Sequence, residues 1–128
     1  MKTNQVITFI VEWLKTYAKN AKVNGFVIGV SGGVDSAVTS TLCAMTGLKV
    51  MCLEMPIHQS ESHVSRAQEH INQLEGKFQN VQSTRINLTP IFDSFKDEID
   101  LKHPQKNVDM ALANSRARLR MTTLYYYA

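Results

Sequence analysis

The sequence predicts an α/β fold in which a parallel sheet is covered by helices in three layers. Two observations predict it. Apolar runs that suit buried strands alternate along the chain with stretches whose apolar residues recur at helical spacing. This strand–helix alternation is typical of parallel sheets built with right-handed crossovers. The length of 128 residues allows one domain with a genuine hydrophobic core.

The first half of the chain contains two predicted helices and two predicted strands. Apolar residues recur every three or four positions over Gln5–Lys19, which predicts an amphipathic helix. Val23–Val30 is apolar on successive residues, as expected of a strand covered on both faces. A second helix is expected from about Asp35 to Thr46, and a second buried strand over Leu48–Met55.

The second half continues the same alternation. A polar loop over Ile57–Ser60 precedes a helix that Gly76 closes. The later segments are expected to be an edge strand, a short helix, a loop and a long final helix: Val81–Leu88, Thr89–Asp100, Leu101–Lys106 and Asn107–Tyr127.

Two packing expectations concern these last helices. Four apolar residues of the short helix are expected to face inward: Ile91, Phe92, Phe95 and Ile99. The tyrosines Tyr125–Tyr127 cover most of a helix circumference, so we expect burial on more than one side.

Composition excludes several classes of protein. Apolar residues make up 44% of the chain and charged residues 20%, which is ordinary for a globular domain. The net charge of +3 is mild and the cations are scattered, so no nucleic-acid partner is indicated. No stretch has the length of a membrane span, and Met1–Asn4 does not resemble a signal peptide. Cys43 and Cys52 predict buried free thiols and a reducing cytoplasm.

The most informative segment is Ser31–Ser36, with the sequence Ser-Gly-Gly-Val-Asp-Ser, directly after the first predicted strand. Gly32 and Gly33 allow a ligand to approach the main chain closely. The segment ends where a helix begins, so free backbone N–H groups and the positive helix end point at one spot. The sequence therefore predicts a phosphate site at the carboxyl end of a strand, where open α/β sheets bind ligands.

Asp35 adds a carboxylate to this site. A bare carboxylate would repel phosphate, so its presence predicts a bridging divalent cation, Mg²⁺. The alternative is a Ser/Gly turn that only caps a helix. The segment is not a Walker A motif, because no Gly-Lys-Ser/Thr follows the glycines. It matches the SGGxDS signature of the ATP pyrophosphatase (PP-loop) superfamily, whose members cleave ATP between the α and β phosphates.

The final helix carries a second group of polar residues, Ala113–Met121. Asn114 and Arg118 are four residues apart and share a face, while Arg116 and Arg120 form a second such pair. A solvated basic face is the ordinary explanation of such charges.

Together, SGGVDS and the later A-N-S-R-A-R-L-R-M resemble the ammonia-dependent NAD⁺ synthetase family over essentially the whole chain. The resemblance implies an adenine nucleotide alpha hydrolase-like, Rossmann-like sheet, with residues 1–128 forming a single, partial ATP-binding domain. It also implies a homodimer.

The activity that the resemblance implies is a two-step ligation. ATP adenylates the nicotinate carboxylate of deamido-NAD⁺ and pyrophosphate leaves; ammonia then displaces AMP to give NAD⁺. Asn114 and Arg118 would contact deamido-NAD⁺, Asp35 would hold Mg²⁺, and Leu53–Met55 would lie near the adenine. No catalytic side chain is nominated. The residues expected to hold ATP are Gly29, Val30, Ser31, Gly32, Gly33, Val34, Asp35 and Ser36.

The sequence departs from the family in two respects. Some bacterial members have Arg where this chain has Glu54, which puts an ATP contact from that side chain in doubt. The family also continues past the last helix, with a fourth strand pairing with the first, so the sheet is expected to be truncated after about three strands. We expect low or no activity from this piece alone, and self-association through the open strand edge.

Three alternatives stay open at this point. One is another PP-loop enzyme, such as a GMP synthetase-like, asparagine-synthetase-like or tRNA-modifying protein. Another is a module that binds ATP without chemistry, and a third is a structural oligomerisation domain. A separate glutaminase that supplies the ammonia is also compatible with the sequence.

Overall fold

A computed structural model of the chain describes residues 2–102, 106 and 108–128. Its helices and strands alternate in the predicted order up to the last two helices. They are α1 (Thr3–Ala21), β1 (Gly25–Gly29), α2 (Val34–Met45), β2 (Lys49–Glu54), α3 (Glu61–Lys77), β3 (Val81–Arg85), α4 (Thr89–Lys102) and α5 (Asp109–Tyr127).

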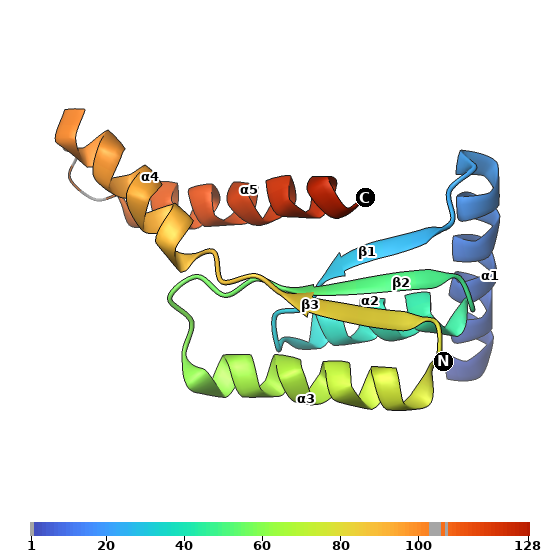
Figure 1. Cartoon of the computed structure of the whole chain (residues 1–128). Helices are drawn as coiled ribbons and strands as arrows, with labels where there is room; N and C mark the ends of the chain where they lie inside the picture. Colours follow the sequence, from blue (N-terminus) through green and yellow to red (C-terminus); the bar gives the residue numbers. More distant parts are fainter. Residues whose placement is uncertain (1, 103–105, 107) are drawn as a thin grey trace.

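The three strands form one parallel sheet in the order β1-β2-β3. Gly25 pairs with Lys49 at one end of the sheet, and Glu54 pairs with Arg85 at the other. Helices α2 and α3 cover one face, α5 lies over the carboxyl end of the other, and α1 crosses the amino-terminal end (Figure 1). The predicted three-layer α/β architecture is thus confirmed, with β1 and β3 as edge strands.

The core consists of two clusters, one on each face of the sheet. The cluster under α2 and α3 contains Val50 and Cys52 of β2 together with Ile71 of α3. The cluster under α4 and α5 contains Leu53 and Phe92, against which Leu119 and Leu124 pack. Successive residues of β2 alternate between these clusters, as the pleat of a strand requires.

The strands are shorter than the sequence predicts. β1 begins at Gly25 rather than Val23, and β3 ends at Arg85 rather than Leu88. A side chain at position 25 would collide with the Lys49 carbonyl, so the close approach of β1 and β2 requires glycine there. Position 107, expected to begin the final helix, lies outside the described residues, as do positions 103–105 of the expected loop; positions 101 and 102 belong to α4.

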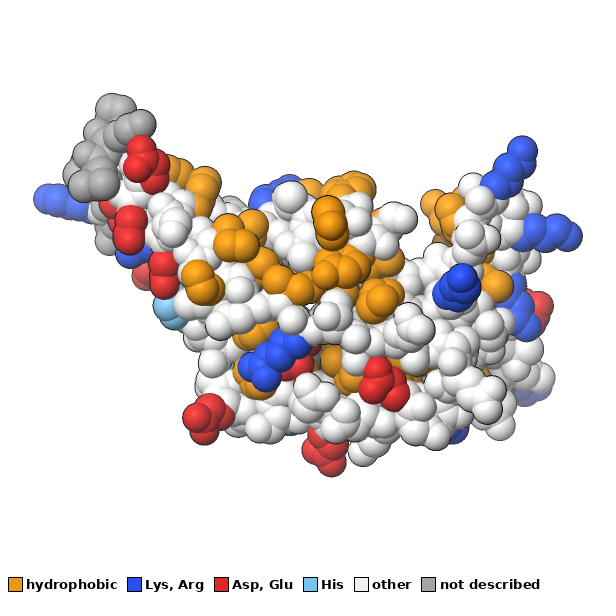
Figure 2. Space-filling view, in the orientation of Figure 1, with side chains coloured by type: hydrophobic (Ala, Val, Ile, Leu, Met, Phe, Trp, Pro, Cys, Tyr) orange, Lys and Arg blue, Asp and Glu red, His pale blue; other side chains and the backbone are white. Residues whose placement is uncertain are grey.

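Two packing expectations for the last helices are wrong. Of the four apolar residues of α4, only Phe92 is buried, while Ile91, Phe95 and Ile99 are exposed. The three tyrosines at the end of α5 are exposed as well, Tyr126 by 85%. The reason is that α4 projects beyond the end of the sheet, whereas α5 lies over one face of the sheet with its other side uncovered (Figure 1). Hydrophobic side chains accordingly gather on the surface over these two helices (Figure 2).

In the part of the chain that the structure describes, no helix is both long enough and apolar enough for a bilayer crossing.

Candidate phosphate-binding site

The Ser31–Ser36 loop leaves the sheet at the carboxyl end of β1 and leads directly into α2. The amide of Val30 still donates to the Leu53 carbonyl at 2.8 Å, so the sheet fixes the entry to the loop. Gly33 is the N-cap of α2, and no side chain caps the helix there. The N–H groups of the first turn are therefore directed at the site without an intrahelical partner, which is the arrangement that binds anions.

Two serine hydroxyls hold the loop in this shape. Ser36 Oγ accepts a hydrogen bond from the Ser31 amide at 3.1 Å and donates to the Gly33 carbonyl at 3.1 Å. Ser31 Oγ accepts from the Gly33 amide at 3.3 Å and lies 3.2 Å from Ser36 Oγ. The loop is thus organised before any ligand binds, and its remaining amides are free to face one.

Gly32 shows why this loop needs glycine. Its φ of +83° lies in the left-handed region, which disfavours every L side chain. A Cβ at this position would also stand 2.6 Å from the carbonyl oxygen of His63 in α3. The loop therefore packs directly on the first turns of α3, and this contact holds it against a second element.

Asp35 is exposed in the first turn of α2. Its carboxylate makes no hydrogen bond or ion pair with any described residue, so its oxygens are available to a ligand. The described residues contain no group of three or more His, Cys, Asp or Glu side chains that would hold a metal alone. The chemistry of Asp35 suits a hard cation such as Mg²⁺, which commonly takes one carboxylate and completes its shell with phosphate and water oxygens.

The structure does not bring Asn114 and Arg118 to this loop. Both lie on the outer face of α5, where they line a shallow hollow of about 480 Å³ with Ala117 and Met121. Within the described part of the chain, the Arg118 guanidinium donates only to the Met121 sulfur, at 3.6 Å. The shared face that the spacing predicts is confirmed, but within one chain that face points away from the sheet.

The inner face of α5 carries the other two arginines, which the sequence did not single out as site residues. Arg120 Nε donates a hydrogen bond to the Met55 carbonyl at 2.9 Å, which links α5 to the end of β2. Arg116 lies over the Phe92 ring, with its guanidinium carbon 5.7 Å from the ring centre. Their four-residue spacing indicated a common face, but nothing in the sequence showed that this face is the inner one.

Glu54 is another residue whose surroundings the sequence could not show. It is only 3% exposed, and neither carboxylate oxygen has a hydrogen-bond partner among the described residues. The nearest cation is Arg85 on β3, whose Nε lies 3.8 Å from Glu54 Oε1. Because both carboxylate oxygens are buried, Glu54 does not present them to a ligand at the loop.

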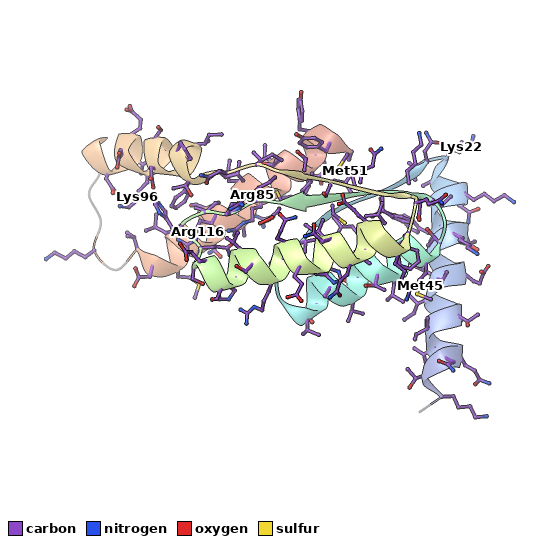
Figure 3. All side chains as sticks on the ribbon, turned by 60° about the horizontal axis from the view of Figure 1, so that its bottom comes forward. Lys22, Met45, Met51, Arg85, Lys96 and Arg116 are labelled. Atoms are coloured by element: carbon purple, nitrogen blue, oxygen red, sulfur yellow. The ribbon has the colours of Figure 1, made fainter. Side chains whose placement is uncertain are left out.

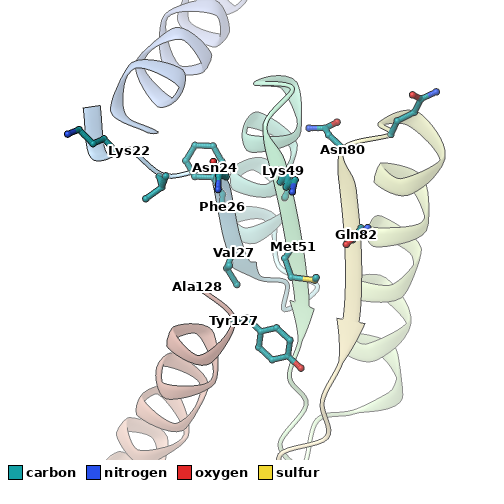
Figure 4. Close-up of a pocket in the computed structure, with 14 residues that line it drawn as sticks. Lys22, Asn24, Phe26, Val27, Lys49, Met51, Asn80, Gln82, Tyr127 and Ala128 are labelled. Atoms are coloured by element: carbon teal, nitrogen blue, oxygen red, sulfur yellow. The ribbon is translucent and has the colours of Figure 1, made fainter. Parts of the chain in front are cut away.

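A larger hollow of about 680 Å³ lies elsewhere, at the amino-terminal ends of the strands. Lys22, Lys49, Asn80 and Tyr127 surround it (Figure 4). It is at the opposite end of β1 from the Ser31–Ser36 loop and contains no helix N-terminus directed at it. The loop, and not this hollow, has the chemistry of a phosphate site.

The two cysteines are free and buried, as predicted. Burial raises the pKa of both thiols to about 11; for Cys52 the charges of Glu75 and Cys43 add to the effect. Neither is a thiolate near neutral pH, so neither is suited to nucleophilic or sulfur-transfer chemistry.

A parallel sheet whose first strand leads through a Ser-Gly-Gly loop into an uncapped helix is the arrangement of the PP-loop fold. The family model described as NAD synthase matches residues 6–128, and the chain belongs to this family. Two named relatives are NH(3)-dependent NAD(+) synthetases. The protein of Mesoplasma florum is 36% identical over 130 residues, which span all of this chain and 50% of the relative. The protein of Saccharolobus solfataricus is 36% identical over 125 residues, 96% of this chain and 42% of the relative.

Solved structures agree with this assignment. An NMN synthetase from Francisella tularensis superimposes with a TM-score of 0.88 at 31% identity, covering 100% of this chain and 50% of that one. An NH3-dependent NAD synthetase from Campylobacter jejuni gives a TM-score of 0.82 at 30% identity, covering 99% and 52%. The chain thus spans about half the length of the relatives it matches.

Proposed function

We propose that this chain binds ATP at Ser31–Ser36 and forms the nucleotide-binding half of an ammonia-dependent NAD⁺ synthetase. The observation that carries the proposal is the uncapped N-terminus of α2 behind a preorganised Ser-Gly-Gly loop, in a chain of the NAD synthase family. In this function ATP adenylates the carboxylate of deamido-NAD⁺ with release of pyrophosphate. Ammonia then attacks the acyl carbon and AMP leaves.

The residues of the chain contribute binding and orientation to the first step. The loop amides and the hydroxyl of Ser31 donate to phosphate oxygens, where the helix dipole also favours negative charge. The Ser36 hydroxyl joins them by giving up its hydrogen bond to the Gly33 carbonyl. The carboxylate of Asp35 would hold Mg²⁺ at this site. When bound, that cation neutralises the charge that builds up on the departing pyrophosphate. The main-chain segment Gly29–Val30 fixes the loop to the sheet, and Leu53–Met55 lies next to it at the end of β2.

Deamido-NAD⁺ is proposed to contact Asn114 and Arg118. These residues have a free, exposed face in a single chain, and the planar guanidinium suits an anionic group. Since that face points away from the loop, a homodimer supplies the most direct way to complete the site. Two free thiols support a cytoplasmic location, which stays part of the proposal.

One observation favours NMN as an alternative product to NAD⁺. The structural relative from F. tularensis, at 31% identity, is named an NMN synthetase rather than an NAD synthetase. The experiment therefore compares deamido-NAD⁺ with its mononucleotide counterpart as the acid to be amidated. The raised thiol pKa values of Cys43 and Cys52 argue against the tRNA-thiolating alternative.

Calorimetric titration of the chain with ATP, with and without Mg²⁺, tests the proposal. Asp35→Asn is expected to weaken Mg²⁺-dependent ATP binding about tenfold or more, because a charge-assisted contact contributes roughly 1.5–3 kcal/mol. Asp109→Asn is the matched control, since Asp109 also lies exposed in the first turn of a helix. If the wild-type chain bound no ATP, the proposal would be wrong. Equal ATP affinity and metal requirement in Asp35→Asn would exclude the metal role.

Chromatography of mixtures containing ATP, ammonia and each acid tests the chemistry. We expect ATP binding with little or no NAD⁺ or NMN produced by this chain alone. Robust ammonia-dependent formation of either product would contradict the expected low activity, and its identity would decide between the two acids. Binding of ATP at unchanged affinity in the presence and absence of both acids would favour a module that only holds the nucleotide.

A further inference from the structure

Two arginines on the inner face of α5 form a pair of neighbouring positive charges. Arg116 and Arg120 are one helical turn apart, and both are half-buried, whereas Arg118 between them is exposed. Burial and the charge of Arg116 lower the pKa of Arg120. The fold therefore holds two like charges together on the side of the helix that faces the sheet.

Neither guanidinium has an acidic partner among the described residues. Arg120 uses its Nε–H on the Met55 carbonyl, which leaves the N–H groups of both Nη atoms free. The guanidinium of Arg116 lies over the Phe92 ring and makes no hydrogen bond or ion pair with any described residue. A cation–π contact uses the charge of the guanidinium and not its N–H donors, which stay available to a ligand. A pair of partly desolvated cations with so many free donors is suited to an anion.

The pair lies at the same end of the sheet as the phosphate loop. Arg116 appears with Arg85 at the carboxyl end of the strands in Figure 3. Met55, whose carbonyl accepts from Arg120, also reaches the loop side, because its methyl group lies 3.0 Å from where a Gly29 Cβ would stand. One residue therefore contacts both Arg120 and the strand end that opens into the loop.

The phosphate loop itself lacks a positive side chain. Ser31–Ser36 offers amides, two hydroxyls and one carboxylate, and no Lys or Arg. A nucleoside triphosphate has several negative charges, and sites that cleave such chains commonly place Lys or Arg side chains on them as well as Mg²⁺. Phosphate is also the anion that matches the planar, bidentate donors of arginine.

We propose that Arg116 and Arg120 form a two-guanidinium clamp that binds the phosphate chain of the nucleotide seated on Ser31–Ser36. The inference rests on the proposed ATP binding and adds residues to it that the sequence did not assign. The clamp places the inner face of α5 on the nucleotide and leaves the outer face, with Arg118, to a different ligand or partner.

Titration with three probes tests the clamp: ATP, AMP and inorganic pyrophosphate, each at the same ionic strength. Arg116→Gln is expected to weaken ATP and pyrophosphate about tenfold or more and AMP by much less, since only the first two carry the phosphate chain. Arg116→Lys keeps the charge and is expected to recover part of the affinity. Lys96→Gln is the matched control, because it removes a cation from the neighbouring α4.

Arg116 makes no hydrogen bond with the described residues that α5 needs, so its replacement is expected to leave the helical circular dichroism unchanged. Arg120→Lys provides a second test that retains a cation near Met55. Equal affinity of wild type and Arg116→Gln for both ATP and pyrophosphate would overturn the clamp and leave the proposed ATP site standing. If wild type bound pyrophosphate but not ATP, and Arg116→Gln lost the pyrophosphate, the proposed function would fail; the arginine pair would bind a diphosphate, and its role as a nucleotide clamp would be overturned. An equal loss in Lys96→Gln would show a general charge effect and overturn the clamp.

Discussion

Gly32→Ala is the substitution for which the structure predicts the largest effect in the loop. The φ of +83° costs an L side chain about 1–2 kcal/mol. The added methyl group would also stand 2.6 Å from the His63 carbonyl, so α3 or the loop must move, which adds about 1–3 kcal/mol. The total loss of unfolding free energy is about 2–5 kcal/mol. We expect the displaced loop to lose ATP affinity as well.

Two other glycines separate these terms. Gly47 has a φ of +76° with nothing within 4 Å of a new Cβ, so Gly47→Ala should cost only the backbone term, about 1–2 kcal/mol. Gly76 lies in α3 with open space around it, and alanine there should stabilise by about 0.5–1 kcal/mol. Urea denaturation followed by circular dichroism measures all three. Equal losses in Gly32→Ala and Gly47→Ala would refute the argument that the loop is packed against α3.

Three further predictions concern burial, pH and association. Glu54→Gln is expected to raise the urea midpoint, because it removes a buried carboxylate whose oxygens have no hydrogen-bond partner. Arg85→Gln should lower the midpoint, because it leaves that carboxylate without its cation. Midpoints that shift in the same direction in both variants would contradict this. Burial lowers the pKa of His70 below 6.5 in the folded chain. Below pH 6.5 the unfolded chain therefore binds more protons than the folded chain, and the free energy of unfolding should fall as the pH drops from 6.5 through the folded-state pKa. His70→Gln should flatten that fall in urea midpoints between pH 7.5 and 5.5. Sedimentation over a range of concentrations should show species larger than a monomer, because the β1 edge is unpaired; a monomer throughout would exclude association through this edge.

Much of the fold could be predicted because it depends on local pattern. The apolar runs before Ser31 and Pro56 become β1 and β2, and the helical spacing after Ser36 becomes α2. The errors arise where packing between distant segments decides. The early end of β3 and the exposure of Phe95 and Tyr126 depend on how far α4 and α5 stand from the sheet, and no local sequence signal contains that distance.

The phosphate loop could be predicted because its donors are main-chain groups of consecutive residues. The hydrogen bonds between Ser31, Gly33 and Ser36 span five residues or fewer, so the sequence contains the whole arrangement. Glu54 and Arg85 are different, because they meet only through the register of two strands. A site formed by such pairing needs the structure.

Helix α5 shows how a periodic motif leads to two separate assignments. Alternate positions from Asn114 to Arg120 fall into two pairs with four-residue spacing, and each pair shares a face. The sequence shows that the two pairs lie on different faces of the helix. It does not show which pair faces the sheet, since polar residues occupy both faces. Leu119 and Leu124 pack against the cluster that contains Leu53, and this packing determines the rotation of α5 about its axis. Arg116 and Arg120 consequently lie on the side that faces the sheet. The two faces can therefore be tested independently, with pyrophosphate affinity reporting on the inner pair and deamido-NAD⁺ affinity reporting on the outer one.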